Sequence, residues 1–167
     1  MNIIVQTPRI TVREFNAEEE NIYLNHFTNE EVILHLPKRS REERINIFRT
    51  ALANYAFTQQ TGIWGMFDNT NGNFIGSCLL RPFEGSDRIL ELGYSMDKSH
   101  WGKGIATEMA IAVVNHAFTY ETTDQIVGVT TLENTASQNV LQKAGLIRQD
   151  DVDKGNEVVA FFRKERA

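Results

Sequence analysis

Alternating and helical spacings of apolar residues predict the first elements of the chain. Residues 9–15 alternate apolar and polar side chains, as a half-buried β-strand does. Residues 16–28 and 40–59 are predicted as helices because each opens with Asn or Ser followed three residues later by Glu, the capping-box pattern. A turn or short helix that ends at Pro37 separates them.

Strand patterns dominate the middle of the chain. Residues 63–67 and 74–80 flank a segment rich in Asp, Asn and Gly, which predicts a β-hairpin, and residues 89–96 form a third strand. The remaining chain predicts a helix, a strand, a helix and a final hairpin, over residues 104–120, 125–132, 134–145, 147–150 and 157–162. The order β-α-α-β-β-β-α-β-α-β-β predicts a mixed α+β sheet rather than a doubly wound parallel one.

Composition fits one domain over residues 1–167, without a repeat, a low-complexity stretch or a linker. Cys78 is the only cysteine, so neither an intrachain disulfide nor a cysteine-rich metal site is expected, and no spacing among the four histidines indicates a metal site. Apolar runs are too short to cross a bilayer, and the first residues lack the pattern of a secretory signal. We therefore expect a cytoplasmic protein that does not insert into membranes.

The net charge of −5 argues against a nucleic-acid partner, because broad binding to nucleic acid needs a concentrated basic face. A mildly acidic protein could instead attract cationic substrates such as amines. A small basic cluster, made of Lys38, Arg39, Arg41 and Arg44, is interrupted by Glu42 and Glu43 and is interpreted as a solvated helix face.

A glycine-rich turn is the strongest candidate for a binding site. It reads Trp-Gly-Lys-Gly-Ile-Ala-Thr over residues 101–107 and joins the strand at 89–96 to the helix that follows. The start of a helix leaves backbone N–H groups unpaired and carries partial positive charge, so it binds phosphate. Glycines let the backbone approach an anion, Lys103 adds a cation, and the Thr107 hydroxyl adds a donor.

Three interpretations of this turn compete. A P-loop template fails because Lys103 stands between two glycines. A dinucleotide fingerprint fails because Thr107 replaces the third glycine and the order of elements is wrong. A glycine-rich turn without a ligand remains possible on the turn alone.

Residues 90–96 together with residues 100–108 resemble the acetyl-CoA motif of GNAT-type N-acetyltransferases. The family pattern Gln/Arg-x-x-Gly-x-Gly/Ala falls on Trp101, Gly104 and Ala106, and Trp in first position is similar to the branch of ribosomal-protein N-terminal acetyltransferases. Residues 7–13 resemble the opening strand of that branch. Residues 134–146 resemble its Asn-x-x-Ser…Lys-x-Gly-Phe segment, with Leu in place of Phe. The resemblance implies the GNAT fold, in which helices flank both faces of a mixed, mostly antiparallel central sheet.

The resemblance also implies acetyl-CoA as co-substrate, without a metal. The pantetheine arm would pair with the splayed strand at residues 93–96, where a free N–H near Ser95 or Met96 would polarise the acyl carbonyl. Asn134 would bond the pantetheine arm or cap its helix. The pyrophosphate would lie over the N–H groups of the glycine-rich turn, which are those of Trp101, Gly102, Lys103, Gly104, Ile105, Ala106 and Thr107.

Candidate groups for proton transfer follow from the same resemblance. Glu91 matches the position at which many members carry a general base. Many members place a Tyr where this chain has Leu141, which cannot protonate a thiolate; Ser137 matches a replacement proposed within the ribosomal-protein branch, and Tyr94 is another possible donor. A surface or salt-bridged role for Glu91 and a purely structural role for Ser137 remain alternatives.

The expected reaction is acetyl transfer to a primary amine by direct attack in a ternary complex. The acceptor is a peptide or protein N-terminus or a small-molecule amine, and residues 29–41 and 83–88 should line the acceptor side. The alternative is a catalytically weak acyl-CoA-binding or regulatory module. We expect a monomer or homodimer, with Cys78 in the core and His26 in an ordinary helical position without a catalytic role.

Overall fold

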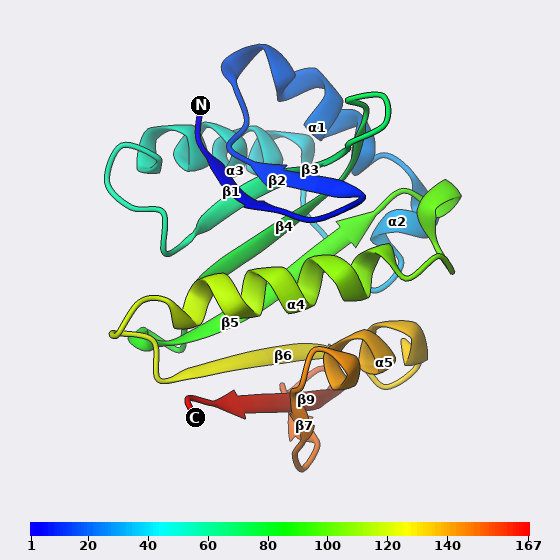
Figure 1. Cartoon of the computed structure of the whole chain (residues 1–167). Coiled ribbons are helices and arrows are strands. Elements are labelled where there is room, and N and C mark those ends of the chain that lie inside the picture. The colour runs from blue at the N-terminus through cyan, green and yellow to red at the C-terminus, as the bar shows by residue number, and fades with distance from the viewer.

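Nine strands form one sheet at the centre of the molecule, in a computed structural model that describes residues 1–167 (Figure 1). In chain order they are β1 (Ile3–Gln6), β2 (Ile10–Arg13), β3 (Gly62–Asp68), β4 (Phe74–Phe83), β5 (Ser86–Met96), β6 (Gln125–Thr131), β7 (Ile147–Arg148), β8 (Val152–Asp153) and β9 (Val158–Glu165). Neighbouring strands follow the order β1-β2-β3-β4-β5-β6-β9-β7, and β8 also pairs with β9. Every pair is antiparallel except β5 with β6.

Helices cover both faces of this sheet. They are α1 (Glu20–His26), α2 (Glu30–Ile33), α3 (Arg41–Asn54), α4 (Ile105–Phe118) and α5 (Thr135–Lys143), with short 3₁₀ turns η1 (Ala17–Glu19) and η2 (Lys98–His100). Figure 1 shows α4 in front of the sheet and α3 behind it. None of the helices is both long enough and apolar enough to span a bilayer.

The larger hydrophobic cluster lies between the sheet and α4. Met109, Val113 and Ala117 have no exposed surface and pack in one cluster with Trp64 of β3 and Leu92 of β5. Their spacing places all three on one side of α4. This packing fixes the helix, and with it the glycine-rich turn at its N-terminus, against β5.

A smaller, aromatic cluster lies on the opposite face, beneath α1 and α3. Phe15 stands at its centre, with its ring centroid between 5.3 and 6.4 Å from those of Tyr23, Phe48, Phe67 and Phe74. Edge-to-face and tilted contacts at such distances add to the energy of apolar burial. The cluster holds the N-terminal helices against β3 and β4.

The side chains of β5 alternate between these two faces, as in any strand. Leu92 belongs to the larger cluster and Tyr94 packs against it. Glu91, Gly93 and Ser95 therefore point to the opposite face, toward α1 and α2. Strand β5 thus directs candidate functional side chains to both faces of the sheet.

The predicted fold class is confirmed, and the structure adds elements that periodicity did not indicate. Strand β1 is an edge strand in which only Ile4 is buried, so it carries no alternating pattern, and its pairing with β2 defines it. The final hairpin contains the extra two-residue strand β8. The helix predicted over residues 40–59 ends at Asn54, and the hydroxyl of the next residue, Tyr55, donates to the carbonyl of Ile63 in β3.

Candidate active site

Strands β5 and β6 separate soon after they meet. Their parallel pairing covers only Ile89, Leu90 and Glu91 of β5, opposite residues 125–127. Strand β5 continues to Met96 and β6 continues to Thr131 without further pairing between them. From residue 92 onward the edge of β5 that faces β6 therefore has no strand partner, and we call this gap in the backbone pairing the β5–β6 opening.

Strand alternation decides which backbone groups of β5 enter this opening. The Asp97 N–H donates to the Ile75 carbonyl of the β4 side (2.9 Å), and the Ser95 carbonyl contacts Gly76 of β4. The N–H groups of Tyr94 and Met96 must then face the other way, into the opening. Of the two positions expected to offer a free N–H, Met96 directs its N–H into the opening and Ser95 directs its N–H toward β4.

The glycine-rich turn lies at the end of this opening. Gly102 (φ 72°) and Gly104 (φ 78°) both adopt the left-handed conformation that favours glycine. The Trp101 indole Nε1 donates to the Met96 carbonyl at 2.8 Å, which joins the turn to the last residue of β5. The sequence folds this way because two glycines relieve the strain of a sharp strand-to-helix turn.

Helix α4 begins without a side-chain cap. Ser40 caps α3 and Asn134 caps α5, but Gly104 offers no side chain to the first N–H groups of α4. The N–H groups of the first turn, those of Ile105, Ala106 and Thr107, therefore have no partner from a cap. An open helix start next to left-handed glycines is suited to bind an anion.

Arg9 adds a second cation to this turn, and sequence reasoning missed it. Its Nη1 donates to the Lys103 carbonyl at 2.7 Å, and its Nε pairs with Glu108 Oε1 at 2.8 Å. Burial opposes ionisation of Glu108, but hydrogen bonds from Thr7 and Arg9 outweigh it and hold the pKa of this carboxyl below its usual range. No local pattern indicates this role, since Arg9 and Lys103 lie 94 positions apart.

Ser137 and Tyr94 meet on the α4 side of the opening. The Asn134 Oδ1 accepts from the Ser137 N–H at 3.1 Å, so Asn134 caps α5, as one of the two interpretations held. Burial raises the pKa of the Tyr94 phenol, and the neighbouring Ser137 side chain offsets this only in part. A protonated phenol thus lies near the serine that the sequence singled out.

Glu91 lies on the opposite face and is paired with Arg81 of β4. The Arg81 Nε donates to Glu91 Oε1 at 2.9 Å, while Oε2 has no hydrogen-bond partner in the chain. The Glu91 side chain is only 16% exposed. Glu91 is therefore salt-bridged, as one of the two interpretations held. Its Oε2 is still free to accept a proton or a hydrogen bond.

His26 connects α1 to the end of β5 through two hydrogen bonds. Its Nε2 lies 2.9 Å from Ser95 Oγ and its Nδ1 lies 2.8 Å from Asp97 Oδ1. The imidazole is completely buried. The sequence suggested an ordinary surface or partly buried position. Instead, His26 is hydrogen-bonded to both residues that flank Met96.

Burial lowers the pKa of His26, and Arg44 lowers it further, whereas Asp97 raises it in part. The neutral ring then donates from Nδ1 to Asp97 and accepts at Nε2 from the Ser95 hydroxyl. The contact with Asp97 is therefore a hydrogen bond from a neutral ring rather than an ion pair.

The segment expected to line the acceptor side does approach the opening. Helix α2 lies against β5, and His35 Nδ1 lies 2.8 Å from Thr131 Oγ1 at the end of β6. This contact brings the chain after α2 to the far end of the opening, on the face that carries Glu91.

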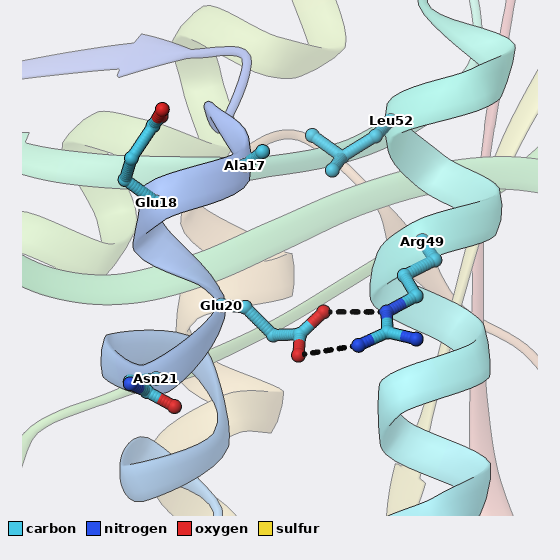
Figure 2. Close-up of a pocket in the computed structure, with 6 residues that line it drawn as sticks. All are labelled: Ala17, Glu18, Glu20, Asn21, Arg49 and Leu52. Atoms are coloured by element: carbon cyan, nitrogen blue, oxygen red, sulfur yellow. Dashed lines mark hydrogen bonds and ion pairs between the residues drawn. The ribbon is translucent and has the colours of Figure 1, made fainter.

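A shallow depression of about 430 Å³ lies elsewhere, between η1, α1 and α3 (Figure 2). Figure 2 shows that Glu20 and Arg49 pair across it, with two contacts of 2.8 and 3.0 Å. The two charges satisfy each other. Glu18, which also lines the depression, is its one charged side chain without an ion-pair partner, and the depression lies apart from the β5–β6 opening.

Residues 9–147 match the family model of the acetyltransferase (GNAT) domain. The chain belongs to the GNAT acetyltransferase family. It is therefore an acyl-CoA-dependent N-acetyltransferase, for which acetyl-CoA is the acyl donor that the family uses. The resemblance seen in the sequence is confirmed.

Relatives and solved structures agree with this assignment. The acetyltransferase is 28% identical over 155 residues to the uncharacterized N-acetyltransferase YoaA of Bacillus subtilis, covering 87% of this chain and 86% of YoaA. The Salmonella typhimurium enzyme that modifies the N-terminal serine of ribosomal protein L7/L12 has a TM-score of 0.84 at 14% identity, covering 99% of this chain and 100% of that chain. A structure of RimL in complex with coenzyme A has a TM-score of 0.84 at 15% identity, with 98% of each chain covered. These two structures thus share the fold of this chain.

The buried His26 predicts a pH-dependent stability of the acetyltransferase. Its pKa is lowered in the folded state, so the unfolded chain takes up the proton first as pH falls below about 6.5. The free energy of unfolding should then decrease from pH 7 to pH 5, by at most about 1.4 kcal/mol per pH unit from this group. In His26→Gln this contribution to the pH dependence of the free energy of unfolding should be absent. Urea titrations of both proteins at each pH measure it. Parallel curves for the two proteins would contradict the assignment of a neutral buried ring.

Proposed function

We propose that the acetyltransferase binds acetyl-CoA between β5 and β6 and receives a primary amine on the face of the sheet that carries Glu91. The observation that carries this proposal is the uncapped start of α4, with its two left-handed glycines, at the end of the β5–β6 opening. An anion site and an unpaired strand edge lie end to end, which suits a ligand with a pyrophosphate at one end and an amide-containing arm at the other.

The residues present fit this co-substrate. The first-turn N–H groups of α4, with Lys103 and Arg9, would hold the pyrophosphate. The free edge of β5 would pair with the arm, and the Met96 N–H or the Tyr94 N–H would donate to the acyl carbonyl. Asn134 uses Oδ1 for its cap, so its Nδ2 would be the group that bonds the arm. When bound, acetyl-CoA supplies an activated thioester.

Glu91 would accept the proton of the incoming ammonium through Oε2, directly or through water. The pairing with Arg81 holds the carboxylate in place and leaves that oxygen free. An amine must lose its proton before it can attack a carbonyl. Glu91 would therefore act on the acceptor side of β5.

Tyr94 and Ser137 would supply the proton that the leaving thiolate needs, on the other side of the same strand. The raised pKa of the phenol keeps it protonated, as a general acid must be. With these two hydroxyls as donors, no Tyr is needed at position 141. Leu141 is buried against Gly128 of β6 and contributes to packing.

Direct attack in a ternary complex fits the one cysteine of the chain. Cys78 is 1% exposed in the larger cluster, and burial raises the pKa of its thiol well above its usual range. A buried, protonated thiol is not a nucleophile. The acyl group would therefore pass to the amine without an intermediate on Cys78.

A peptide or protein N-terminus is the first candidate for the acceptor, with a small-molecule amine as the second. The fold shared with the enzyme that acts on ribosomal protein L7/L12 supports the first. The acceptor side, between the chain after α2 and the end of the β4–β5 hairpin, belongs to segments that differ most readily between enzymes of one fold.

An acetyl-transfer assay tests the proposed function. Release of free thiol from acetyl-CoA should require a primary amine, in a panel of small amines and peptides with free N-termini. The same peptides with acetylated N-termini serve as matched controls and should give only background release. Tight coenzyme A binding without turnover of any amine would contradict the proposal.

Two substitutions should separate the proton-transfer steps. Glu91→Gln is expected to lower kcat about 100-fold at pH 7, with a smaller deficit at higher pH, where the amine loses its proton unaided. Tyr94→Phe should lower kcat by a similar factor, and this deficit should not shrink at higher pH. Adding Ser137→Ala to Tyr94→Phe should lower kcat little further, because the two hydroxyls act together. Coenzyme A affinity serves as the control and should stay unchanged. Full kcat in either single variant would remove that residue from its role.

The glycine-rich turn can be tested with a matched pair of glycines. Gly104→Ala forces alanine to a φ of 78°, at a cost of about 1–2 kcal/mol, which should weaken coenzyme A binding about tenfold in calorimetry. Gly72→Ala imposes the same strain (φ 74°) in the β3–β4 turn, where no atom lies within 4 Å of the new Cβ. It should lose similar stability and bind coenzyme A normally. Equal affinities in the two variants would exclude the turn from the site.

A further inference from the structure

Arg163 of β9 is a partly buried arginine without an anionic partner. Its Nε is buried and has no hydrogen-bond partner, and no carboxylate lies within ion-pair distance of its guanidinium. Arg13, by contrast, makes two bonds to Glu19, both of 2.9 Å. A buried N–H without an acceptor is costly, so a site that retains one suits an anion that binds there.

The register of the sheet places Arg163 on the same face as Glu91. Arg81 pairs with Glu91, Glu91 with Val127, and Val127 with Arg163, across β4, β5, β6 and β9. Directly paired residues point to one side of a sheet, so the four form a row on the acceptor face. Two strand spacings separate the Cα atoms of Glu91 and Arg163, about 10 Å. The long arginine side chain shortens the distance between the functional groups.

The tip of the β4–β5 hairpin bends over this part of the face. Phe83, at the end of β4, has its ring centroid 5.7 Å from that of Phe161 on β9, although β5 and β6 lie between these strands. Positive φ values at Glu84 and Gly85 make the tight turn that follows Phe83. Arg163 lies beside Phe161, with its Cζ 5.8 Å from the ring centroid. The aromatic pair limits access of water to the guanidinium and strengthens its attraction for an anion.

We propose that the acceptor of this acetyltransferase carries a carboxylate, which Arg163 binds while the amine reaches Glu91. The inference rests on the proposed function, since it takes Glu91 to mark the place of the amine. The row carries two guanidinium groups and one carboxylate, so it has an excess positive charge that a carboxylate would neutralise. The planar guanidinium offers paired donors that match the two oxygens of such a group. The carboxylate belongs either to a free amino acid or to an acidic side chain near a peptide N-terminus.

Matched acceptors that differ only in this charge test the inference. One pair consists of an amino acid and its amide, and the other of peptides with Asp or Asn at the second position. For the native enzyme, kcat/KM should favour the charged member of at least one pair by about 10- to 100-fold. A preference in the first pair alone identifies an amino acid, and one in the second pair alone identifies an acidic peptide. Equal values within both pairs would overturn the inference.

Arginine variants assign the preference to its side chain. Arg163→Gln should remove the preference while kcat/KM for the amide and the Asn peptide stays near the native value. Arg163→Lys keeps the positive charge and the aliphatic part of the side chain, so it should retain part of the preference. This variant is measured in place of Arg163→Gln if the latter does not fold. Arg148→Gln is the matched control, because Arg148 of β7 lies over Phe162 on the opposite face and should leave the preference intact. A preference that persists in both Arg163 variants would overturn the assignment.

These outcomes also separate the inference from the proposed function. If neutral amines are acetylated and charge makes no difference, the carboxylate site is wrong and the acetyl-transfer proposal stands. If no amine of either kind is acetylated although coenzyme A binds, the proposed function itself fails.

Discussion

The divergence of β5 from β6 is the constraint around which the rest of the site is built. After Glu91 and Val127 the two strands no longer pair, so half of β5 has backbone donors and acceptors without a strand partner. Backbone groups removed from water must find partners, and here the fold supplies only some of them. The Trp101 indole satisfies the Met96 carbonyl, and His26 holds Ser95 and Asp97 from the other face. Pairing with β4 as far as Met96 keeps the strand extended beyond its last contact with β6, and the edge that faces β6 stays available to a ligand.

The period of two in β5 separates the two proton transfers that acetyl transfer requires. Glu91 points to the α1–α2 face and Tyr94 to the α4–α5 face, so a base for the amine and an acid for the thiolate need not compete for one proton. Gly93, between them, carries no side chain, and the Leu79 side chain would lie 3.2 Å from a Cβ placed there. A larger residue at this position would crowd the strand where both reactants approach. The arrangement thus follows from four consecutive residues and the twist that parts β5 from β6.

Local patterns of the sequence predicted what depends on local structure. The Ser40 capping box forms with both bonds, at 2.9 and 3.1 Å, and the glycine-rich turn and the Asn134 cap lie where the spacing placed them. Contacts between distant segments could not be read in this way. His26 reaches Asp97 across 71 positions and Arg9 reaches Lys103 across 94, and no local pattern indicates either contact. Arg163 lies in a plain β-strand pattern, and only the register of four strands aligns it with Glu91.

The placement of charge shows why net charge was a weak guide to the acceptor. A total of −5 suggested attraction for cations, yet Arg9 and Lys103 meet at the glycine-rich turn, and Arg81 and Arg163 lie in the same row of the sheet as Glu91. Charges beyond a Debye length of about 8 Å are screened at physiological ionic strength, so the nearest groups dominate what a ligand experiences. Acidic residues elsewhere, such as Glu20 and Asp124, are already paired with arginines. Arg9 and Arg81 are also paired, with Glu108 and Glu91, whereas Lys103 and Arg163 have no carboxylate within ion-pair distance. These two cations favour a negatively charged co-substrate at one end of the opening and an anionic group of the acceptor at the other.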